Sequence, residues 1–388
     1  MTTNFIDELK GLDPNLFERL NREITEEKIY EYLKPLADTY SPSQSVRYTR
    51  ARVLQNLLIQ DGVLNHPNVH FDSNYQRTGN SVILIGQNEV GKQIWLLAHL
   101  DNISYLVQPK TNGVYPLTPL CYHMMLPGQL PGVVISYSLD NKTYQPVSEG
   151  TITTDNEGHV FYEPKDGKDV RAGQRVCFMS EMSWDQETGE IKGSIDDAAG
   201  AVALVLAAKF LAHYNIEILL GLTDEEEGVA GESNQTICRG GARLLRYFDQ
   251  PNLVIATDIH ESAPMIEGKG PTGIQQGEGA SFAEKASHNR GEITPPHLYE
   301  ILRQLAKDID NQGIRLRENL DGYLSRTEGV NAMLRTPNVA LIGFLGENRH
   351  FQKEETTSNI RDLVDLAKSV VCLTLLTQTP IWKEIMQD

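Results

Sequence analysis

Side chains that can bind a metal ion stand where apolar runs of this chain stop, and this pattern constrains its fold more than any other feature. Five short stretches share it: His99 with Asp101, Asp196 with Asp197, Glu225 with Glu226, Asp258, and His350. An open α/β sheet binds its ligands just beyond the carboxyl ends of its strands, so residues far apart in sequence converge there. The pattern therefore predicts an α/β fold with one shared site at an edge of the sheet.

The residue types at these positions indicate a pair of metal ions. One His and two carboxylates per metal, with one carboxylate shared, is the set that a two-metal hydrolase needs. Taken singly, the positions also have structural explanations: Asp196 or Asp197 suits a helix cap, and Asp258 suits a turn. Their joint occurrence, in order along the chain, favours the metal site.

Two of the stretches predict more than ligands. Residues two apart in a strand point to the same face, so Asp101 is placed to hydrogen-bond His99 and fix its tautomer. Glu225 and Glu226 follow a strand closely, where adjacent glutamates can divide into one metal ligand and one general base. We therefore expect both strand ends to carry groups that assist the chemistry.

The order of the expected elements divides the chain into three parts. Residues 1–105 begin an α/β domain, residues 106–188 form an inserted β-barrel-like domain, and residues 189–388 complete the α/β domain. The insert is predicted because this stretch has short alternating segments, frequent turn signals and no sustained helical period. Alternating strands and helices on either side predict a mostly parallel sheet with helices on both faces.

Hydrophobic periodicity places the individual elements. Helices are expected within residues 4–58, with breaks at Pro35 and Pro42, and at residues 198–213, 241–248, 297–312 and 360–376. Strands are expected at residues 81–86, 93–100, 217–223, 253–259 and 339–346. A Gly/Pro-rich loop is expected over residues 262–279.

Composition narrows the environment and the partners. The chain has 388 residues and a formal net charge of -17, which argues against nucleic acid or an anionic membrane as a partner. Four scattered cysteines form no CxxC pair, so neither a disulfide framework nor a thiolate zinc site is expected. The start of the chain shows no secretion signal, and we expect a cytoplasmic protein.

The sequence around the candidate ligands resembles a known family. The similar stretches are Leu97-Ala98-His99-Leu100-Asp101, Ile195-Asp196-Asp197, Glu225-Glu226 followed by Gly228 and Gly231, Arg239-Gly240-Gly241-Ala242, Pro251-Asn252-Leu253 leading to Asp258, and Gly268-Lys269-Gly270-Pro271. In this order they resemble the co-catalytic two-metal metallopeptidases, and most of all the tetrahedral-assembly (TET) aminopeptidases, which include glutamyl and deblocking aminopeptidases. The resemblance covers nearly the whole chain except about the first thirty residues.

The resemblance implies a role for each candidate residue. Asp196 bridges two metals, His99 and Asp258 hold one of them, Glu226 and His350 hold the other, Glu225 is the general base, and Asp101 orients His99. It also implies a cis peptide after Asp196, and assembly through the β insert from dimers up to hollow dodecamers. The metals implied are two divalent ions per chain, with zinc expected first and cobalt or manganese suited to the same ligands.

Three short stretches beside the site depart from the family pattern. They are Ser325-Arg326-Thr327-Glu328, Glu347-Asn348-Arg349-His350-Phe351, and Asn102-Ile103-Ser104. The family tends to have Gly-Gly-Thr-Asp, an Arg-Tyr-x-His-Ser run, and Glu-Ile-Gly at these places. Side-chain preference is therefore where this chain is expected to differ most.

The leading functional prediction is a metallo-aminopeptidase that removes N-terminal residues from peptides. In it a water between the two metals has its pKa lowered toward about 7, and Glu225 accepts its proton. Two alternatives stay open at this point. One is a two-metal deacylase or amidohydrolase acting on N-acyl amino acids, and the other is a metal-stabilised assembly that binds peptides without cleaving them.

Overall fold

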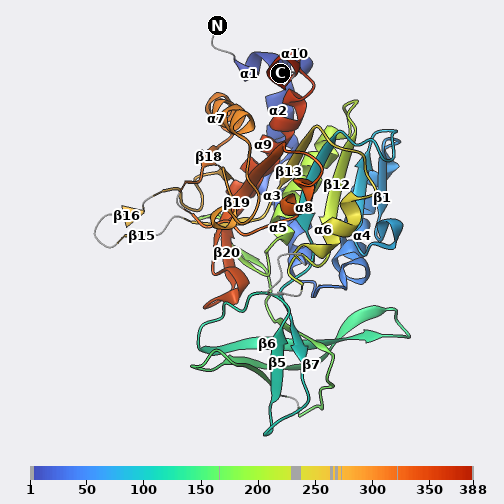
Figure 1. Cartoon of the computed structure of the whole chain (residues 1–388), viewed down its shortest axis with the longest axis vertical. Helices are drawn as coiled ribbons and strands as arrows, with labels where there is room; N and C mark the ends of the chain where they lie inside the picture. Colours follow the sequence, from blue (N-terminus) through green and yellow to red (C-terminus); the bar gives the residue numbers. More distant parts are fainter. Residues whose placement is uncertain are drawn as a thin grey trace.

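The computed structural model describes residues 4–165, 167–228, 237–262, 265–266, 270–271, 273–320 and 322–386. A large sheet flanked by helices forms one end of the molecule, and a closed β-barrel projects from the other (Figure 1). The two chain termini lie together at the end away from the barrel (Figure 1). No helix among the described residues has the length and apolar content needed to span a membrane.

The sheet is mixed: it is parallel at its centre and antiparallel on both flanks. Across it run β1 (Val69–Asp72), β2 (Ser81–Ile85), β12 (Ile218–Thr223), β3 (Ile94–His99), β13 (Leu253–Ala256), β19 (Val339–Glu347), β20 (Thr356–Asn359), β11 (Glu190–Gly193) and β10 (Ser183–Trp184). The β12, β3, β13 and β19 strands pair in parallel, whereas β1–β2, β2–β12, β19–β20, β20–β11 and β11–β10 pair antiparallel. The prediction of a mostly parallel sheet holds only for the centre, because short connections such as that between β10 and β11 allow only antiparallel pairing.

Three further short strands extend this sheet near β19. They are β14 (Ile259–Glu261), which pairs in parallel with β19, and β17 (Ala280–Ala283) and β18 (Leu316–Glu318), which pair with each other. The strand expected over residues 253–259 is therefore two strands, interrupted at Thr257 and Asp258. The interruption leaves Asp258 just beyond the carboxyl end of β13.

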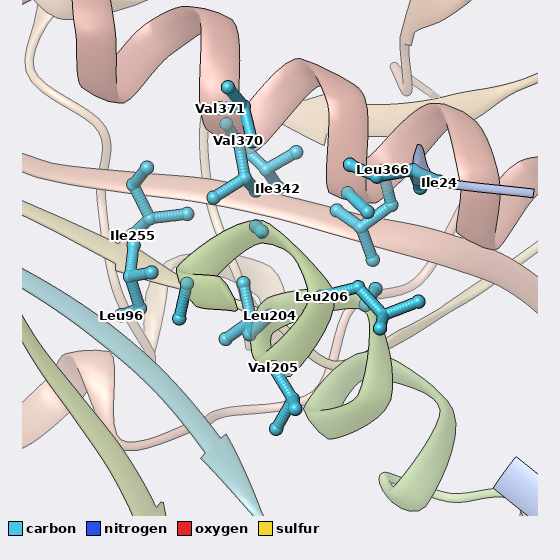
Figure 2. Close-up of a cluster of buried hydrophobic side chains, with 14 of the residues drawn as sticks. Ile24, Leu96, Leu204, Val205, Leu206, Ile255, Ile342, Leu366, Val370 and Val371 are labelled. Atoms are coloured by element: carbon cyan, nitrogen blue, oxygen red, sulfur yellow. The ribbon is translucent and has the colours of Figure 1, made fainter. Parts of the chain in front are cut away.

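Alternate residues of the central strands face two hydrophobic cores. Leu96, Ile255 and Ile342 point to the core under α5 (Ala198–Leu211) and α9 (Ile360–Leu376), as Figure 2 shows. Their neighbours Trp95 and Val254 point to the other core, beneath α6 (Arg239–Leu245) and α8 (Gly329–Ala332). This alternation covers both faces of the sheet, as predicted.

The remaining helices gather on the α5–α9 side and toward the chain ends. They are α1 (Phe5–Leu12), α2 (Leu16–Glu23), α3 (Glu26–Ala37), α4 (Arg50–Gln60), α7 (Pro296–Asp310) and α10 (Pro380–Met386). The predicted break at Pro35 is wrong, because α3 continues through it to Ala37. Pro35 lies in the last turn, so it removes only one helical hydrogen bond before the helix ends.

The barrel follows the first ligand stretch and precedes the second. Its strands close in the order β4 (Tyr105–Val107), β5 (Tyr115–Pro119), β8 (Val160–Pro164), β7 (Thr143–Thr154), β6 (Gly128–Ser138) and β9 (Arg175–Phe178). Its interior holds Val134, Ile152, Tyr162 and Val176, all fully buried. Phe351, from the turn that carries His350, joins this core, so the barrel packs directly against the candidate site.

The loop expected over residues 262–279 contains a short hairpin of β15 (Met265–Ile266) and β16 (Gly270–Pro271). Two glycine-containing stretches that the resemblance singled out, Gly231 and Gly268-Lys269, lie outside the described residues.

Candidate metal centre

All five residues predicted as metal ligands line one cavity at the carboxyl ends of the central strands. They are His99, Asp196, Glu226, Asp258 and His350. Glu227, Cys121, Ser325, Arg326 and Arg349 line the same cavity. The predicted convergence of distant stretches is therefore what the fold produces.

His99 ends β3 and is almost completely buried, with 1% of its surface exposed. Its Nδ1 lies 3.1 Å from the carbonyl oxygen of Asp101, so Nδ1 is the donor of this hydrogen bond. Nε2 faces the cavity, 3.5 Å from Asp196 Oδ1 and 3.9 Å from Glu226 Oε2, and makes no hydrogen bond with the described residues. This orientation leaves Nε2 available to bind a metal.

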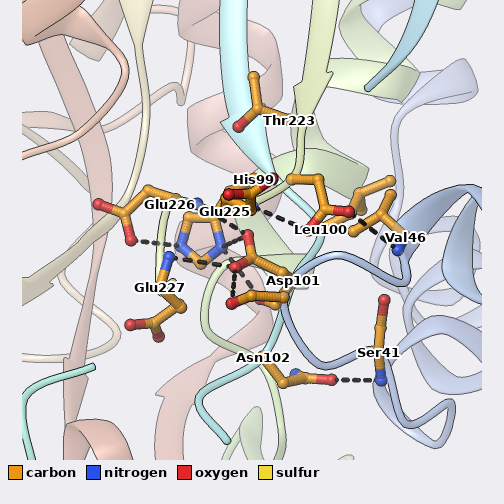
Figure 3. Close-up of polar contacts among 12 residues, drawn as sticks. Ser41, Val46, His99, Leu100, Asp101, Asn102, Thr223, Glu225, Glu226 and Glu227 are labelled. Atoms are coloured by element: carbon orange, nitrogen blue, oxygen red, sulfur yellow. Dashed lines mark hydrogen bonds and ion pairs between the residues drawn. The ribbon is translucent and has the colours of Figure 1, made fainter. Parts of the chain in front are cut away.

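The Asp101 carboxylate binds the loop after β12 (Figure 3). Its two oxygens accept hydrogen bonds from the backbone N–H groups of Glu226 and Glu227, both at 3.1 Å, and Oδ2 also accepts from the Ser43 hydroxyl at 2.6 Å. The carboxylate itself is 3.6 Å from His99 Nδ1. The backbone carbonyl of Asp101 orients the imidazole, while its side chain positions two glutamates of the loop after β12.

Asp196 and Asp197 take different parts at the start of α5. The peptide bond between them is cis, as the resemblance implied. Asp197 caps the helix, since its side chain accepts a hydrogen bond from the Gly200 N–H at 3.1 Å. Asp196 faces the cavity, where Oδ1 points to His99 and Oδ2 lies 3.8 Å from His350 Nε2. Its carboxylate therefore lies between the two imidazoles.

The three consecutive glutamates after β12 point in different directions. The Glu225 backbone has a positive φ of 64°, and its carboxylate forms ion pairs with Arg239 at 2.9 Å and Arg243 at 2.5 Å on α6. Glu225 does not line the cavity, whereas Glu226 and Glu227 do. Glu227 Oε2 lies 3.4 Å from His350 Nε2. The sequence predicted that Glu225 and Glu226 face the site. In the structure the two glutamates that face it are Glu226 and Glu227, each one residue later in the chain.

Asp258 and His350 complete the lining of the cavity. Asp258 Oδ2 accepts a hydrogen bond from the Ser325 hydroxyl at 2.9 Å. His350 is in a short turn after β19 with a positive φ of 56°, and its Nδ1 donates to the carbonyl oxygen of Tyr122 at 2.9 Å. Tyr122 belongs to the connection between β5 and β6, so the barrel fixes the orientation of this second imidazole.

The buried charges of the cavity fit bound cations. Burial raises the pKa of Glu226 and of Glu227 well above the usual value, and burial and the nearby Asp196 raise that of Asp258 to about 7. Burial lowers the pKa of His99, but Asp196 and Glu226 outweigh it and raise that pKa well above its usual range. Without a cation, these carboxyl groups cannot all be ionised together, because like charges in a buried site repel strongly.

The donor set also fits divalent metals. Ligand atoms of His99, Asp196 and Glu227 lie within 4.8 Å of one another, and so do those of Cys121, Glu227 and His350. Imidazole with carboxylate suits zinc, and cobalt or manganese can use the same ligands. The two groups share Glu227, and Asp196 faces both imidazoles, so these residues fit divalent cations.

Sequence reasoning missed three contributors to this site. Glu227 belongs to a run of three glutamates whose roles the sequence does not distinguish. Arg239 and Arg243 lie one helical turn apart, which was a signal that one of these glutamates pairs with arginines. The Tyr122 carbonyl is a backbone group and leaves no trace in the sequence. Cys121 was not considered because it belongs to no CxxC pair.

Several solved peptidase structures are similar to this chain. An aminopeptidase from the archaeon Desulfurococcus kamchatkensis matches it with a TM-score of 0.69 and 17% identity, over 94% of this chain and 98% of that chain. The TET aminopeptidase from the marine sediment archaeon Thaumarchaeota archaeon SCGC AB-539-E09 gives 0.68 and 16%, over 93% and 98%. The TET1 peptidase of Pyrococcus horikoshii gives 0.64 and 17%, over 89% and 99%. No protein-family model and no curated protein matches the sequence. The chain has the fold of these peptidases along nearly its whole length.

Proposed function

We propose that this protein is a two-metal aminopeptidase. The observation that carries the proposal is the position of the Asp196 carboxylate. Its Oδ1 lies 3.5 Å from His99 Nε2, and its Oδ2 lies 3.8 Å from His350 Nε2. A carboxylate that lies between two imidazoles, each with Nε2 facing the cavity, is placed as a ligand that bridges two metals would be. The fold shared with aminopeptidases supports the same conclusion.

Five residues would hold the two cations. His99 and Asp258 would bind one, Glu227 and His350 the other, and Asp196 both. When bound, such cations would supply Lewis-acid chemistry, which polarises a scissile carbonyl and lowers the pKa of a water bound to a cation toward about 7. Relative to the sequence prediction, Glu227 replaces Glu226 as the ligand of the second cation.

Glu226 is the general base of the proposed reaction. It lies in the cavity beside His99, with its backbone N–H bound to Asp101, so its carboxylate has a defined place next to the reacting groups. In the reaction it takes a proton from the attacking water and passes it to the leaving amine. Glu225 cannot take this role in the observed conformation, because its carboxylate is paired with two arginines of α6.

A matched pair of variants tests this assignment. Glu226→Gln is expected to lower kcat by about 10²–10⁴-fold with two metals per chain retained. Glu225→Gln is the control, which breaks the pairs with Arg239 and Arg243 and leaves most of the turnover. Metal content by atomic absorption and turnover of aminoacyl anilides are the measurements. If Glu225→Gln abolishes turnover while Glu226→Gln loses one metal, the sequence-based assignment is restored.

The substrate class is tested on the same protein. The proposal predicts that aminoacyl anilides and unblocked peptides are cleaved from the N-terminus and that N-acyl amino acids are not. Faster cleavage of N-acyl amino acids would establish the deacylase alternative. Metal binding with no hydrolysis of either class would establish a peptide-binding assembly.

We also propose that the chain forms a homo-oligomer. The TET1 peptidase of Pyrococcus horikoshii can assemble into a tetrahedron or a large octahedral shell. Light scattering coupled to size-exclusion chromatography gives the subunit number directly, and a monomer at micromolar concentration would contradict the proposal.

A further inference from the structure

One thiol reaches the metal centre from the barrel. Cys121 lies in the connection between β5 and β6, next to Tyr122, and lines the cavity. Its Sγ is 2.7 Å from Glu227 Oε2 and 4.0 Å from His350 Nδ1. In the structure the thiol donates a hydrogen bond to the Glu227 carboxylate.

The position of this sulfur matches that of a ligand. Cys, His and carboxylate ligands bind zinc at roughly 2.0–2.3 Å, so two donor atoms on one zinc lie about 3–4 Å apart. The distance of 3.4 Å from Glu227 to His350 falls within this spacing, and the hydrogen-bonded distance of 2.7 Å from Sγ to Glu227 is shorter than it. Ligand atoms of Cys121, Glu227 and His350 all lie within 4.8 Å of one another. A second observation points to a cation in the same cavity: His99 Nε2 is buried, faces the cavity and makes no hydrogen bond with the described residues.

The two cation positions differ in the sulfur available to them. No cysteine among the described residues hydrogen-bonds to His99 or Asp258. The other thiol at the cavity, Cys238, lies 3.5 Å from Glu226 Oε1, which belongs to the proposed base and not to a ligand. In the described part of the chain, a cysteine sulfur therefore hydrogen-bonds to a proposed ligand only at the position of Glu227 and His350.

We propose that Cys121 is a ligand of the second cation, together with Asp196, Glu227 and His350. This inference rests on the proposed function only in needing a cation at that position. When the cation binds, the thiol releases its proton to solvent and the sulfur donates an electron pair to the metal. The hydrogen bond from Cys121 to Glu227 is replaced by two bonds to the same ion.

A sulfur ligand makes the two cation positions differ in their number of protein ligands and in their preference for zinc. Four protein ligands close the position of Cys121, as in structural zinc sites, whereas three ligands at the position of His99 leave one place open. Thiolate also favours zinc over manganese at the closed position. We therefore expect the closed position to keep its zinc under mild chelation while the open position loses it.

Cobalt substitution tests the sulfur ligand by spectroscopy. The full-length protein loaded with two cobalt ions is expected to show a thiolate-to-cobalt charge-transfer band in the near ultraviolet. Cys121→Ser should lose this band but keep the visible cobalt bands, which show that the folded site is still loaded. Cys238→Ser is the matched control and should keep both sets of bands. A band that survives in Cys121→Ser, or disappears in Cys238→Ser, overturns the proposal.

Zinc affinity gives a second readout. Cys121→Ser is expected to weaken one of the two zinc sites by at least about 10–100-fold, the range seen when a partner of a metal ligand is removed. Two sites of unchanged affinity would contradict the proposal. Hydrolysis without a charge-transfer band would refute the sulfur ligand alone, whereas the band without hydrolysis would refute the proposed function alone.

Discussion

The two imidazoles of the candidate site are held in different ways. His99 continues a central strand, and the carbonyl that orients it belongs to Asp101, two residues further along. His350 lies in a left-handed turn, and the carbonyl that orients it belongs to Tyr122, in a connection of the barrel 228 residues earlier. The first half of the site is thus built locally by the sheet, and the second half depends on the seating of the barrel.

The contacts around His350 show how the barrel is seated. Phe351 stacks on Phe178 of β9, with ring centroids 4.5 Å apart and an interplanar angle of 13°. The Leu126 N–H donates to the Gln352 carbonyl at 2.8 Å. Both contacts are made by the two residues directly after His350, so they fix the turn against the barrel. Displacing the barrel should disturb the second half of the site and leave the first half in place.

The shared ligand is expected to give the largest effect. Asp196→Ala removes the only carboxylate proposed for both positions, so both metals should bind weakly. Loss of a general base lowers turnover by up to about 10⁴-fold, and turnover of Asp196→Ala should fall by at least as much. Metal content and turnover are measured together. A variant that still binds one metal tightly would show that the two halves are more independent than proposed.

Asp101→Ala separates the carboxylate of this residue from its carbonyl. The carbonyl that orients His99 stays, whereas the hydrogen bonds to the Glu226 and Glu227 amides are lost. We expect about 10–100-fold weaker metal binding at the position of Glu227, with the position of His99 nearly unchanged. Zinc titration with a competing chelator resolves the two sites. Selective loss of the His99 site would instead support the carboxylate as its orienting group.

Phe351→Leu tests the seating of the barrel. The substitution keeps an apolar side chain but loses a stacked pair, which contributes about 0.5–1.5 kcal/mol. Metal affinity should fall by up to about tenfold at the second position only, since 1.4 kcal/mol is tenfold in binding. Phe282→Leu is the matched control, because Phe282 packs on Tyr299 in the core of the large sheet, whereas Phe351 belongs to the core of the barrel. Equal effects of the two variants would show that the loss is one of general stability.

The smallest effect on the site is expected from a charge in the helical layer. Asp61 accepts hydrogen bonds from Lys28 at 2.9 Å and Tyr32 at 2.8 Å, and from Lys209 of α5. Burial acts to raise the pKa of Asp61, but these partners outweigh it and hold the pKa at about 2. Because the folded pKa lies below the unfolded value of about 3.9, the stabilisation is complete above pH ~4 and disappears as the pH falls through 2.

Asp61→Asn should therefore lower the free energy of unfolding by about 1–2 kcal/mol at pH 7 and by little at pH 2. Urea unfolding at several pH values measures this difference. Glu31→Gln is the control, since Glu31 also pairs with Lys28 but is exposed. Metal content at pH 7 should not change in either variant. A change in metal binding would mean that the helical layer positions the site more directly than the contacts indicate.

The difference between local and long-range contacts also separates the features that the sequence could predict from those that it could not. The run that ends at His99 and the helix that Asp197 caps were predicted because local periodicity and capping determine them. The choice among the three glutamates was not predictable, because the positive φ of Glu225 and its pairing with α6 are tertiary features. The carbonyl of Tyr122 was invisible for the same reason. Local rules gave the ligand types, and long-range packing decided which groups meet.

The place of the barrel in the chain has one more consequence. The barrel begins just after Asp101 and ends before Asp196, and its Tyr122 carbonyl accepts a hydrogen bond from His350, the last of the five ligand stretches. Tilting the barrel against the sheet would rotate one imidazole and leave the other still. A molecule that binds the outer surface of the barrel would thus alter the coordination geometry of a single ion, and the visible spectrum of a cobalt form would report that binding from a distance.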